Sequence, residues 1–250
     1  MLKVKRLFEV KSADRQVAAD DPSNCSITIS VPPEINFTHV CVMAMDISKS
    51  YYLIQGGYNT FTLVELGQNI TITLTPANYS ATQFRTEVAA KLTAASTHAW
   101  TYAVTLPGPT LPQTGKFTFT VTGNGVNQPS IVCTTNVYEQ LGFARNSTNT
   151  FVASTLASGN VIRMQSEDAL YLHSDIVTDS GSDILQEIYT SGVPDFGIIG
   201  YKCNDVGSWS KPMSSQKSNS YQFRLTNEFN RPMTLNGVDW NMTLMCFVMP

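Results

Sequence analysis

Apolar and polar side chains alternate along most of this chain, and the alternation is clearest between Tyr58 and Ala95. In residues 60–64, and again in residues 70–75, apolar side chains occupy every second position. A period of two is typical of half-buried β-strands. Pro76 ends the second run because proline has no backbone N–H to donate. The pattern therefore predicts two strands joined by a tight turn.

The period changes directly after Pro76 and predicts one helix. Ser80 and Gln83 form the S-x-x-Q spacing of a capping box, in which each side chain bonds to the other's backbone N–H. Phe84, Val88 and Leu92 then recur at every fourth position, which gives a helix one apolar stripe. We expect a short helix near residues 80–95 that buries this stripe.

The rest of the chain predicts further strands and polar turns. Residues 37–47 and 242–249 are apolar on both faces, which favours interior strands covered on both sides. About ten short strands and few helices indicate an all-β sandwich or barrel. A jelly-roll β-sandwich (a single jelly roll) with one short inserted α-helix fits best, because its two sheets accommodate eight strands. Periodicity leaves other Greek-key sandwiches open.

No composition shift marks a linker between domains, so we expect one folded domain preceded by an N-terminal arm. Residues 1–24 would be an N-terminal arm and loop, and residues 25–250 a single jelly-roll domain. Residues 146–160 and 207–220 are rich in small polar side chains and predict long surface loops. Residues 184–189 are expected to form a short helix or turn. Asn236-Gly237 is suited to a type I′ turn.

Charge is scarce in this sequence. Of the 250 residues, 14% are charged, against about 25% in an average globular domain, and 42% are hydrophobic. The net charge of -3 gives no general electrostatic reason to expect nucleic-acid binding. Lys3, Lys5 and Arg6 form a small basic cluster that could face packaged DNA or an inner membrane, although an arm that pairs with a neighbouring strand edge is favoured.

The five cysteines are far apart, odd in number and without a C-x-x-C spacing, which favours a reducing compartment and no disulfide framework. The three histidines, His39, His98 and His173, form no H-x-H or H-x-x-x-H pair, so no metal site is predicted. Glu167 and Asp168 are adjacent and would face opposite ways on a strand. No nucleophile elbow or phosphate loop occurs. We expect no enzyme activity and no cofactor.

Short motifs in order along the chain resemble one family. Residues 8–15, Phe-Glu-Val-Lys-Ser-Ala-Asp-Arg, are similar to the opening F-x-V-x-S-x-D-R of penton (vertex, minor capsid) proteins from virophages, polinton-like elements and large double-stranded DNA viruses. Residues 50–54, 58–61 and 72–80 resemble the family's following segments, and 230–233 with 241–244 resemble its closing hairpin. Ala77 and Asn230 stand where the family often has Gly.

This resemblance implies a structural viral capsid protein of the jelly-roll lineage. Its expected partners are itself, as a homopentamer at the icosahedral vertices, and the major capsid protein of the same virus. Its expected location is the virion, after assembly in the host cytoplasm or a viral factory. The alternative from another class is a jelly-roll carbohydrate- or receptor-binding head protein. An exposed aromatic platform or a bound cation would favour that alternative.

Four residues are candidates for contact between subunits. Asp14 and Arg15 follow the N-terminal arm, either in a solvated turn or as a charged anchor within or between subunits. Phe8 belongs to the arm itself. Asn149 lies in the polar stretch 146–160. A closed ring needs one flank of a subunit to dock on the opposite flank of the next, and these four residues are where we look for such flanks.

Overall fold

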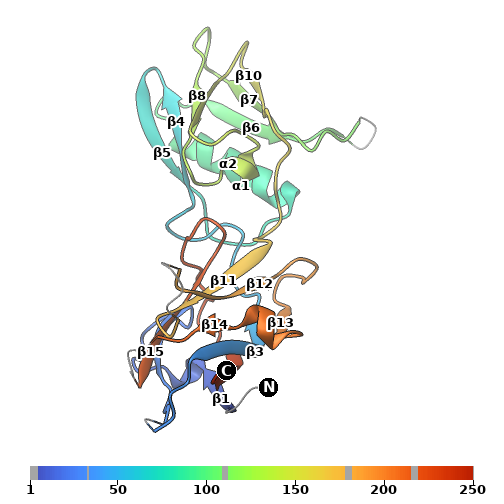
Figure 1. Cartoon of the computed structure of the whole chain (residues 1–250). Helices are drawn as coiled ribbons and strands as arrows, with labels where there is room; N and C mark the ends of the chain where they lie inside the picture. The colour runs from blue at the N-terminus through green and yellow to red at the C-terminus, as the bar shows by residue number, and fades with distance from the viewer. Residues whose placement is uncertain (1–4, 33, 109–111, 178–181, 215–218, 250) are drawn as a thin grey trace. The chain divides into compact units, whose positions relative to one another are not determined.

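The computed structural model describes residues 5–32, 34–108, 112–177, 182–214 and 219–249, and these are mostly antiparallel strands (Figure 1). Their contacts divide the chain into two compact units. The first comprises Met1–Tyr51 with Glu167–Pro250, and the second comprises Tyr52–Ser166. Each unit has its own buried core. The structure therefore differs from the expectation of one domain over residues 25–250, because unit 2 is an insertion between two segments of unit 1.

Unit 1 contains two β-sheets. The first is five-stranded, with β1, β16, β3 and β13 in that order and β14 also paired with β3. The second is four-stranded, with the order β12, β11, β15, β2. The strands are β1 (Lys5–Lys11), β2 (Asn24–Thr28), β3 (His39–Ser48), β11 (Ala169–Ser174), β12 (Ile184–Tyr189), β13 (Ile198–Lys202), β14 (Lys211–Pro212), β15 (Ser220–Thr226) and β16 (Asn241–Phe247).

The strand order of unit 1 is that of a jelly roll. When the eight strands other than the two-residue β14 are counted along the chain, the first sheet has the order 1-8-3-6 and the second 5-4-7-2. All pairings are antiparallel. Two interleaved Greek keys of this kind form the eight-stranded jelly-roll sandwich. The predicted fold class is confirmed, and unit 2 is inserted between the third and fourth strands.

The first half of the central strand β3 is buried on both faces, as its sequence predicts, whereas Asp46 in the second half is exposed. Val40 and Val42 point into the core between the sheets, whereas Cys41 belongs to a smaller cluster with Met245 and Phe247. The β3–β16 register shifts at Thr243 and Leu244, which oppose Ala44 and Val42, so Met43 of β3 is the extra residue of a bulge. The bulge moves the core-facing positions of β3 from Val40 and Val42 to Met45 and Ile47.

The N-terminal residues belong to the sandwich. Strand β1 pairs antiparallel with β16 over its whole length, with Phe8 opposite Leu244 and Val10 opposite Met242. Val10 is 1% exposed. A separate arm over residues 1–24 is therefore not what the described residues show: residues 5–11 are the edge strand of the first sheet of unit 1, followed by the short 3₁₀ helix η1 (Ser12–Asp14).

Unit 2 has a four-stranded and a three-stranded sheet, ordered β5-β4-β8-β9 and β10-β7-β6. Its elements are β4 (Thr60–Glu65), β5 (Gln68–Thr73), α1 (Ala81–Ala95), β6 (Thr101–Thr105), β7 (Thr118–Thr122), β8 (Ser130–Cys133), α2 (Tyr138–Leu141), β9 (Ser147–Thr150) and β10 (Thr155–Ala157).

Helix α1 forms as its sequence predicts. The capping box between Ser80 and Gln83 is present in both directions, and Phe84, Val88 and Leu92 are fully buried. Phe84 stacks on Phe117, with ring centroids 6.1 Å apart. The helix completes the core of unit 2, so it lies in the inserted unit and not among the strands of the jelly roll.

Four local expectations have different outcomes. Residues 184–189 form strand β12 instead of a helix or turn, and the stretch 146–160 contains strands β9 and β10 instead of one long loop. Asn236 and Gly237 both have positive φ, as a type I′ turn requires. Part of the predicted loop 207–220 lies outside the described residues, and the described part includes the end of α3 (Val206–Trp209).

Candidate subunit interface

Phe8 serves the core of unit 1 more than its surface. In β1 the side chains alternate, so that Phe8 and Val10 pack against the sandwich core while Leu7 points outward. Lys5 and Arg6 are exposed, whereas Lys3 lies outside the described residues. Because β1 is the last strand of its sheet, its outer backbone edge is available for contact with another chain.

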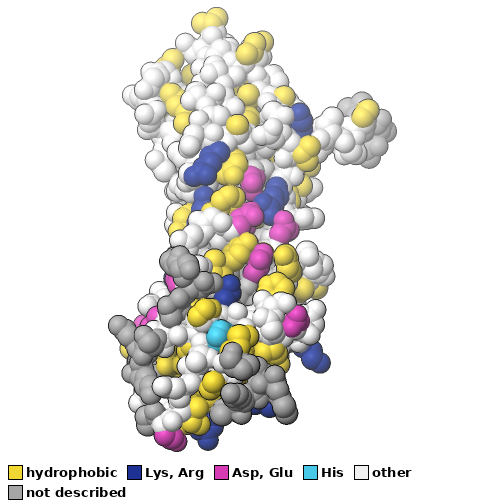
Figure 2. All heavy atoms as spheres, viewed as in Figure 1, with side chains coloured by type: hydrophobic (Ala, Val, Ile, Leu, Met, Phe, Trp, Pro, Cys, Tyr) yellow, Lys and Arg dark blue, Asp and Glu magenta, His cyan; other side chains and the backbone are white. Residues whose placement is uncertain are grey.

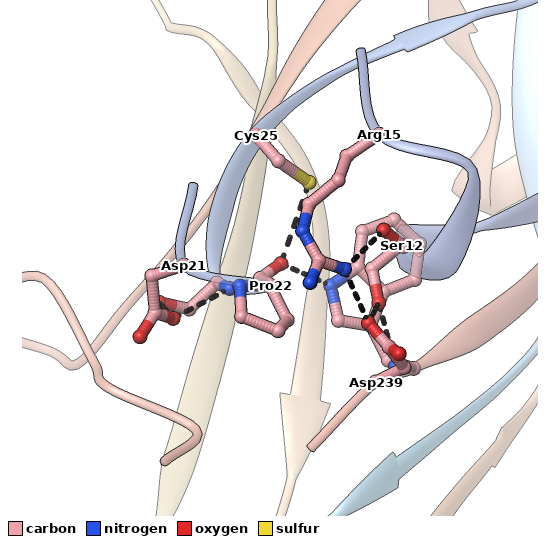
Figure 3. Close-up of polar contacts among 8 residues, drawn as sticks. Ser12, Arg15, Asp21, Pro22, Cys25 and Asp239 are labelled. Carbon is pink, nitrogen blue, oxygen red and sulfur yellow. Dashed lines mark hydrogen bonds and ion pairs between the residues drawn. The ribbon is translucent and has the colours of Figure 1, made fainter. Parts of the chain in front are cut away.

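Arg15 is a charged anchor within its own subunit (Figure 3). Its Nη1 donates to the backbone oxygen of Ser12 at 2.9 Å and to Oδ1 of Asp239 at 2.8 Å. The hydroxyl of Ser12 donates to the same Asp239 oxygen at 2.8 Å. Of the two alternatives that the sequence leaves open, the structure shows the anchor and not a solvated turn. Its ion-pair partner Asp239 comes from the opposite end of the chain.

The surroundings of Arg15 are also tightly hydrogen-bonded. Ser12 and Trp240 are joined through two bonds, from the Trp240 backbone N–H to the Ser12 hydroxyl at 2.9 Å and from the Ser12 backbone N–H to the Trp240 oxygen at 3.0 Å. The Trp240 indole N–H donates to the Pro22 oxygen at 2.7 Å, and Figure 3 shows the Cys25 thiol directed at the same oxygen. Burial raises the pKa of Cys25 to about 11, although the nearby Arg15 charge lowers it. This cluster fastens the chain between β1 and β2 to the start of β16.

Asp14 and Asn149 do not join that cluster. Asp14 is exposed at the end of η1. Asn149 lies in β9, at the edge of a sheet of unit 2, where its side-chain amide donates to the Ile131 oxygen at 3.2 Å. The four candidate residues therefore do not form one site: three are close in the sequence of unit 1, and the fourth belongs to unit 2.

Asp239 and Trp240 are the residues that sequence reasoning missed. They lie 224 positions or more from their partners Arg15 and Ser12. No spacing rule connects residues so distant. The one available signal was the predicted turn at Asn236-Gly237, which lies shortly before Asp239 and Trp240 and leads into β16.

Two opposite flanks of the jelly roll expose large apolar side chains. On one flank, where β1 and β2 are the terminal strands of the two sheets, Leu7 is 60% and Val17 53% exposed. On the other, where β12 and β13 are terminal, Tyr189, Phe196 and Ile198 are each at least 68% exposed. We call these the β1/β2 flank and the β12/β13 flank.

The β12/β13 flank also contains backbone strain. Phe196 has φ +63°, an uncommon conformation for a bulky side chain. Its backbone N–H donates to the Lys49 oxygen at 3.0 Å, and the Lys49 N–H donates to the Gly197 oxygen at 2.8 Å, which together hold the turn in place. Strain of this kind persists where the surrounding structure enforces it, and it is common at functional surfaces.

The two flanks do not differ clearly in charge. From β1 to β2, residues 5–28 contain four basic residues (Lys5, Arg6, Lys11 and Arg15) and four acidic residues (Glu9, Asp14, Asp20 and Asp21), whereas from β12 to β13, residues 184–202 contain Glu187, Asp195 and Lys202. Figure 2 shows one face of the molecule, on which uncharged side chains and backbone predominate, in keeping with the low charge of the sequence. The exposed apolar side chains, and not charge, therefore mark these two flanks as candidate contact surfaces.

A cavity of about 270 Å³ lies in unit 1 beside His173. His173 is buried, and its two ring nitrogens lie 2.6 Å from Asp183 Oδ1 and 2.9 Å from the Thr226 hydroxyl. Arg224 donates to the other oxygen of Asp183 at 3.3 Å. These groups bond to one another, so the cluster is a hydrogen-bonded network within the fold.

Other chemistry is not apparent in the part of the chain that the structure describes. There, no group of three or more His, Cys, Asp or Glu side chains could hold a metal ion, and no helix is long and apolar enough to cross a membrane. Trp100 and Trp240 are buried, as expected for core residues, whereas Trp209 is 41% exposed. A platform of exposed tryptophans for a sugar is therefore not formed by these three.

The fold defines this chain as a jelly-roll protein with an inserted β-rich unit. No family model matches the chain, and no curated protein matches it. Among solved structures it is similar to the penton protein of mavirus, with a TM-score of 0.48 and 10% identity over 97% of this chain and 99% of that one. It is also similar to domains D2–D3 of the flagellar cap protein FliD from Escherichia coli, with a TM-score of 0.19 and 10% identity over 89% of this chain and 100% of that one. At these values neither similarity assigns a family or a function.

Proposed function

We propose that this chain is a structural capsid protein, the penton subunit that occupies icosahedral vertices as a homopentamer. Its partners in this proposal are four further copies of itself and the major capsid protein of the same virus. Its place is the virion, after assembly in the host cytoplasm or a viral factory. It acts through shape and buried interface area, without catalysis.

The sequence motifs that resemble penton proteins support the proposal by where they lie. The first motif, residues 8–15, forms β1, η1 and the Arg15 anchor. The closing motif includes the start of β16, which is the strand that β1 pairs with. The two ends of the resemblance therefore meet in one structural element of the jelly roll, as parts of a common fold would.

The observation that carries the proposal is the pair of exposed flanks. A ring forms when one surface of a subunit docks on a different surface of the next and the rotation closes. The β1/β2 flank and the β12/β13 flank lie at opposite ends of both sheets, and both expose large apolar side chains. A stable interface of this kind buries about 1,200–2,000 Å² in total.

Two charge substitutions test the flanks. We expect Leu7→Glu and Ile198→Glu each to prevent ring formation, because each places a charge in the middle of an apolar contact. Val126→Glu is the matched control: Val126 is 92% exposed and belongs to unit 2, whereas both flanks belong to unit 1. Native mass spectrometry of the wild-type chain should give a mass of five subunits, and the control should keep it.

Mixing the two variants distinguishes a head-to-tail interface from a symmetric one. Leu7→Glu keeps an intact β12/β13 flank and Ile198→Glu keeps an intact β1/β2 flank, so the mixture should form heterodimers that do not close into rings. Where the wild-type chain stays monomeric in solution, its position in the particle decides. Five copies about each vertex axis support the proposal, and a threefold spike or absence from purified particles contradicts it.

The exposed Lys5 and Arg6 extend the proposal to the inside of the particle, where they would face packaged DNA or an inner membrane. Binding of duplex DNA and of vesicles with anionic lipid should fall in a Lys5→Gln/Arg6→Gln variant and should weaken with salt. Equal binding by this variant and the wild-type chain would remove this contact while leaving the capsid proposal intact.

A further inference from the structure

Two cysteine thiols lie side by side on the outer face of the first sheet of unit 1. Cys41 belongs to β3, and Cys203 is the residue directly after β13. Their sulfur atoms are 3.7 Å apart although 162 positions separate them in the sequence. All five cysteines of the chain are free thiols, and Cys203 is the one that is not fully buried.

The local structure explains why the two thiols meet. The last backbone bond that joins this end of β13 to β3 runs from the Cys203 N–H to the Met43 oxygen at 2.8 Å. The chain then enters α3, where the Asp205 side chain caps the first turn by accepting from the Gly207 N–H at 2.9 Å. Val206 of this segment, with Met43 and Cys203, covers the outer cluster of Cys41, Met245 and Phe247.

We propose that Cys41 and Cys203 are a redox modification site, which forms a reversible intramolecular disulfide when the chain meets a small disulfide oxidant such as oxidised glutathione. The bond would fix residues 203–209 on the outer face of β3. The sulfurs must approach from 3.7 Å to about 2.05 Å. Cys203 lies beyond the last paired residue of β13, so a small movement of this segment suffices.

The reaction proceeds by two exchange steps. The Cys203 thiolate attacks one sulfur of the oxidant, whose S–S bond breaks and releases one glutathione thiolate. Cys41 then loses its proton and attacks the Cys203 sulfur, which releases the second glutathione thiolate. Two protein thiols are oxidised to one disulfide, and one oxidised glutathione is reduced to two thiols, so atoms and electrons balance.

The order of the steps follows from exposure and acidity. Cys203 is half-buried and accessible to the oxidant, whereas Cys41 is 0% exposed. Burial, followed by the neighbouring Cys203 thiol, raises the pKa of Cys41 to about 12. The thiolate is the nucleophile in such exchange. Cys41 is therefore suited to the second, intramolecular step, in which proximity to the mixed disulfide compensates for its low acidity.

The experiment uses the full chain, treated with oxidised glutathione at pH 8 and then denatured and alkylated without reduction. We expect the intact mass of the protein to fall by two hydrogens before alkylation and three of the five thiols to be alkylated. Dithiothreitol should restore all five. The oxidised form should melt about 5–10 °C higher, because the crosslink closes a long loop in the unfolded chain.

Cys203→Ser is the decisive variant because its site is half-buried and tolerates a hydroxyl, and it should lose the crosslink. Cys133→Ser, in unit 2, is the control that should keep it. A stable glutathione adduct on Cys203 with Cys41 still alkylated, an unchanged mass, or a crosslink that persists in Cys203→Ser would each overturn the proposal. The result is independent of the capsid assignment, since the assay measures covalent chemistry and not assembly.

Discussion

The two units of this protein differ in how the chain builds them. Unit 2 is one continuous segment, and its strands β4 and β5 are joined by a tight turn. Unit 1 is built from both ends of the chain, so that Lys5 pairs with Phe247. Pairing of distant residues requires a large loop to close before the contacts form, which slows folding. Unit 2 can form from local contacts, whereas unit 1 depends on the meeting of the termini.

Deleting residues 1–11 should have the largest effect and should separate the two units. The deletion removes β1, exposes the edge of β16 and takes the buried Val10 out of the core. We expect a loss of at least about 5 kcal/mol in unit 1, enough to unfold a domain of ordinary stability. Hydrogen exchange should show unit 1 unprotected and unit 2 still protected.

The N-terminal arm that the sequence pattern predicts would instead be removable without unfolding the domain. A truncated chain with full protection in unit 1 would show that β1 contributes little to the fold. It would restore the idea of an N-terminal arm that serves contacts between subunits.

Val88→Asp in α1 is the converse change. Val88 is fully buried among the apolar side chains of unit 2, so an unpaired carboxylate there should cost about 3–5 kcal/mol. Ala90→Asp is the matched control, two positions away on the exposed face of the same helix. Hydrogen exchange should show loss of protection in unit 2 for Val88→Asp only. Equal protection in both variants would mean that this helical face is not essential to the core.

The difference between local contacts in unit 2 and distant pairing in unit 1 also determined which elements could be predicted from the sequence. Helix α1 and strands β4 and β5 depend on neighbours within a few residues, and the capping box and the alternation revealed all three. Strand β12 has the sequence Ile-Leu-Gln-Glu-Ile-Tyr, and its pairing with β11 decides its conformation. A short apolar run of this kind is ambiguous between helix and strand.

The candidate interface was predicted in part for the same reason. Arg15 was singled out from a local motif, and the structure pairs it with Asp239 from the far end of the same chain, while its contact with another subunit stays a prediction. Tyr189 and Ile198 look like ordinary strand residues in the sequence, and their exposure follows from the terminal positions of β12 and β13 in their sheets. The order of strands in a sheet depends on tertiary structure and cannot be predicted from the hydrophobic periodicity of the sequence. Division of the chain into two units was missed because no linker composition marks the insertion.

Each unit also contains a hydrogen-bonded carboxylate, and the contributions of these two carboxylates to the free energy of unfolding should differ. Glu65 of unit 2 is 0% exposed and accepts from the Tyr102 hydroxyl at 2.7 Å. Tyr102→Phe leaves a buried carboxylate short of one donor, which should cost about 2 kcal/mol. Asp239 of unit 1 is 43% exposed, so Asp239→Asn, which removes its ion pair with Arg15, should cost less than about 1 kcal/mol. Urea denaturation measures both, and equal losses would contradict the comparison.

The smallest effect we expect is a pH dependence confined to unit 1. Burial alone would raise the pKa of Asp183, but the hydrogen bonds and positive charge of His173 and Arg224 outweigh burial and lower it below its usual value. Since the folded state then holds this proton less tightly than the unfolded state, unfolding takes up protons near pH 4. The contribution to stability is complete above the unfolded pKa of about 3.9 and is lost as the pH falls through the lower folded value.

Asp183→Asn tests this contribution directly. The side chain is 55% exposed, so solvent screening limits the effect to less than about 1 kcal/mol. The stability difference between wild type and variant should be constant from pH 7 to pH 5 and should shrink as the pH falls below about 4. Hydrogen exchange should locate the change near β11 and β15 of unit 1, with unit 2 unaffected. A difference that grows on acidification would mean that Asp183 holds its proton more tightly in the folded state, contrary to its position between His173 and Arg224.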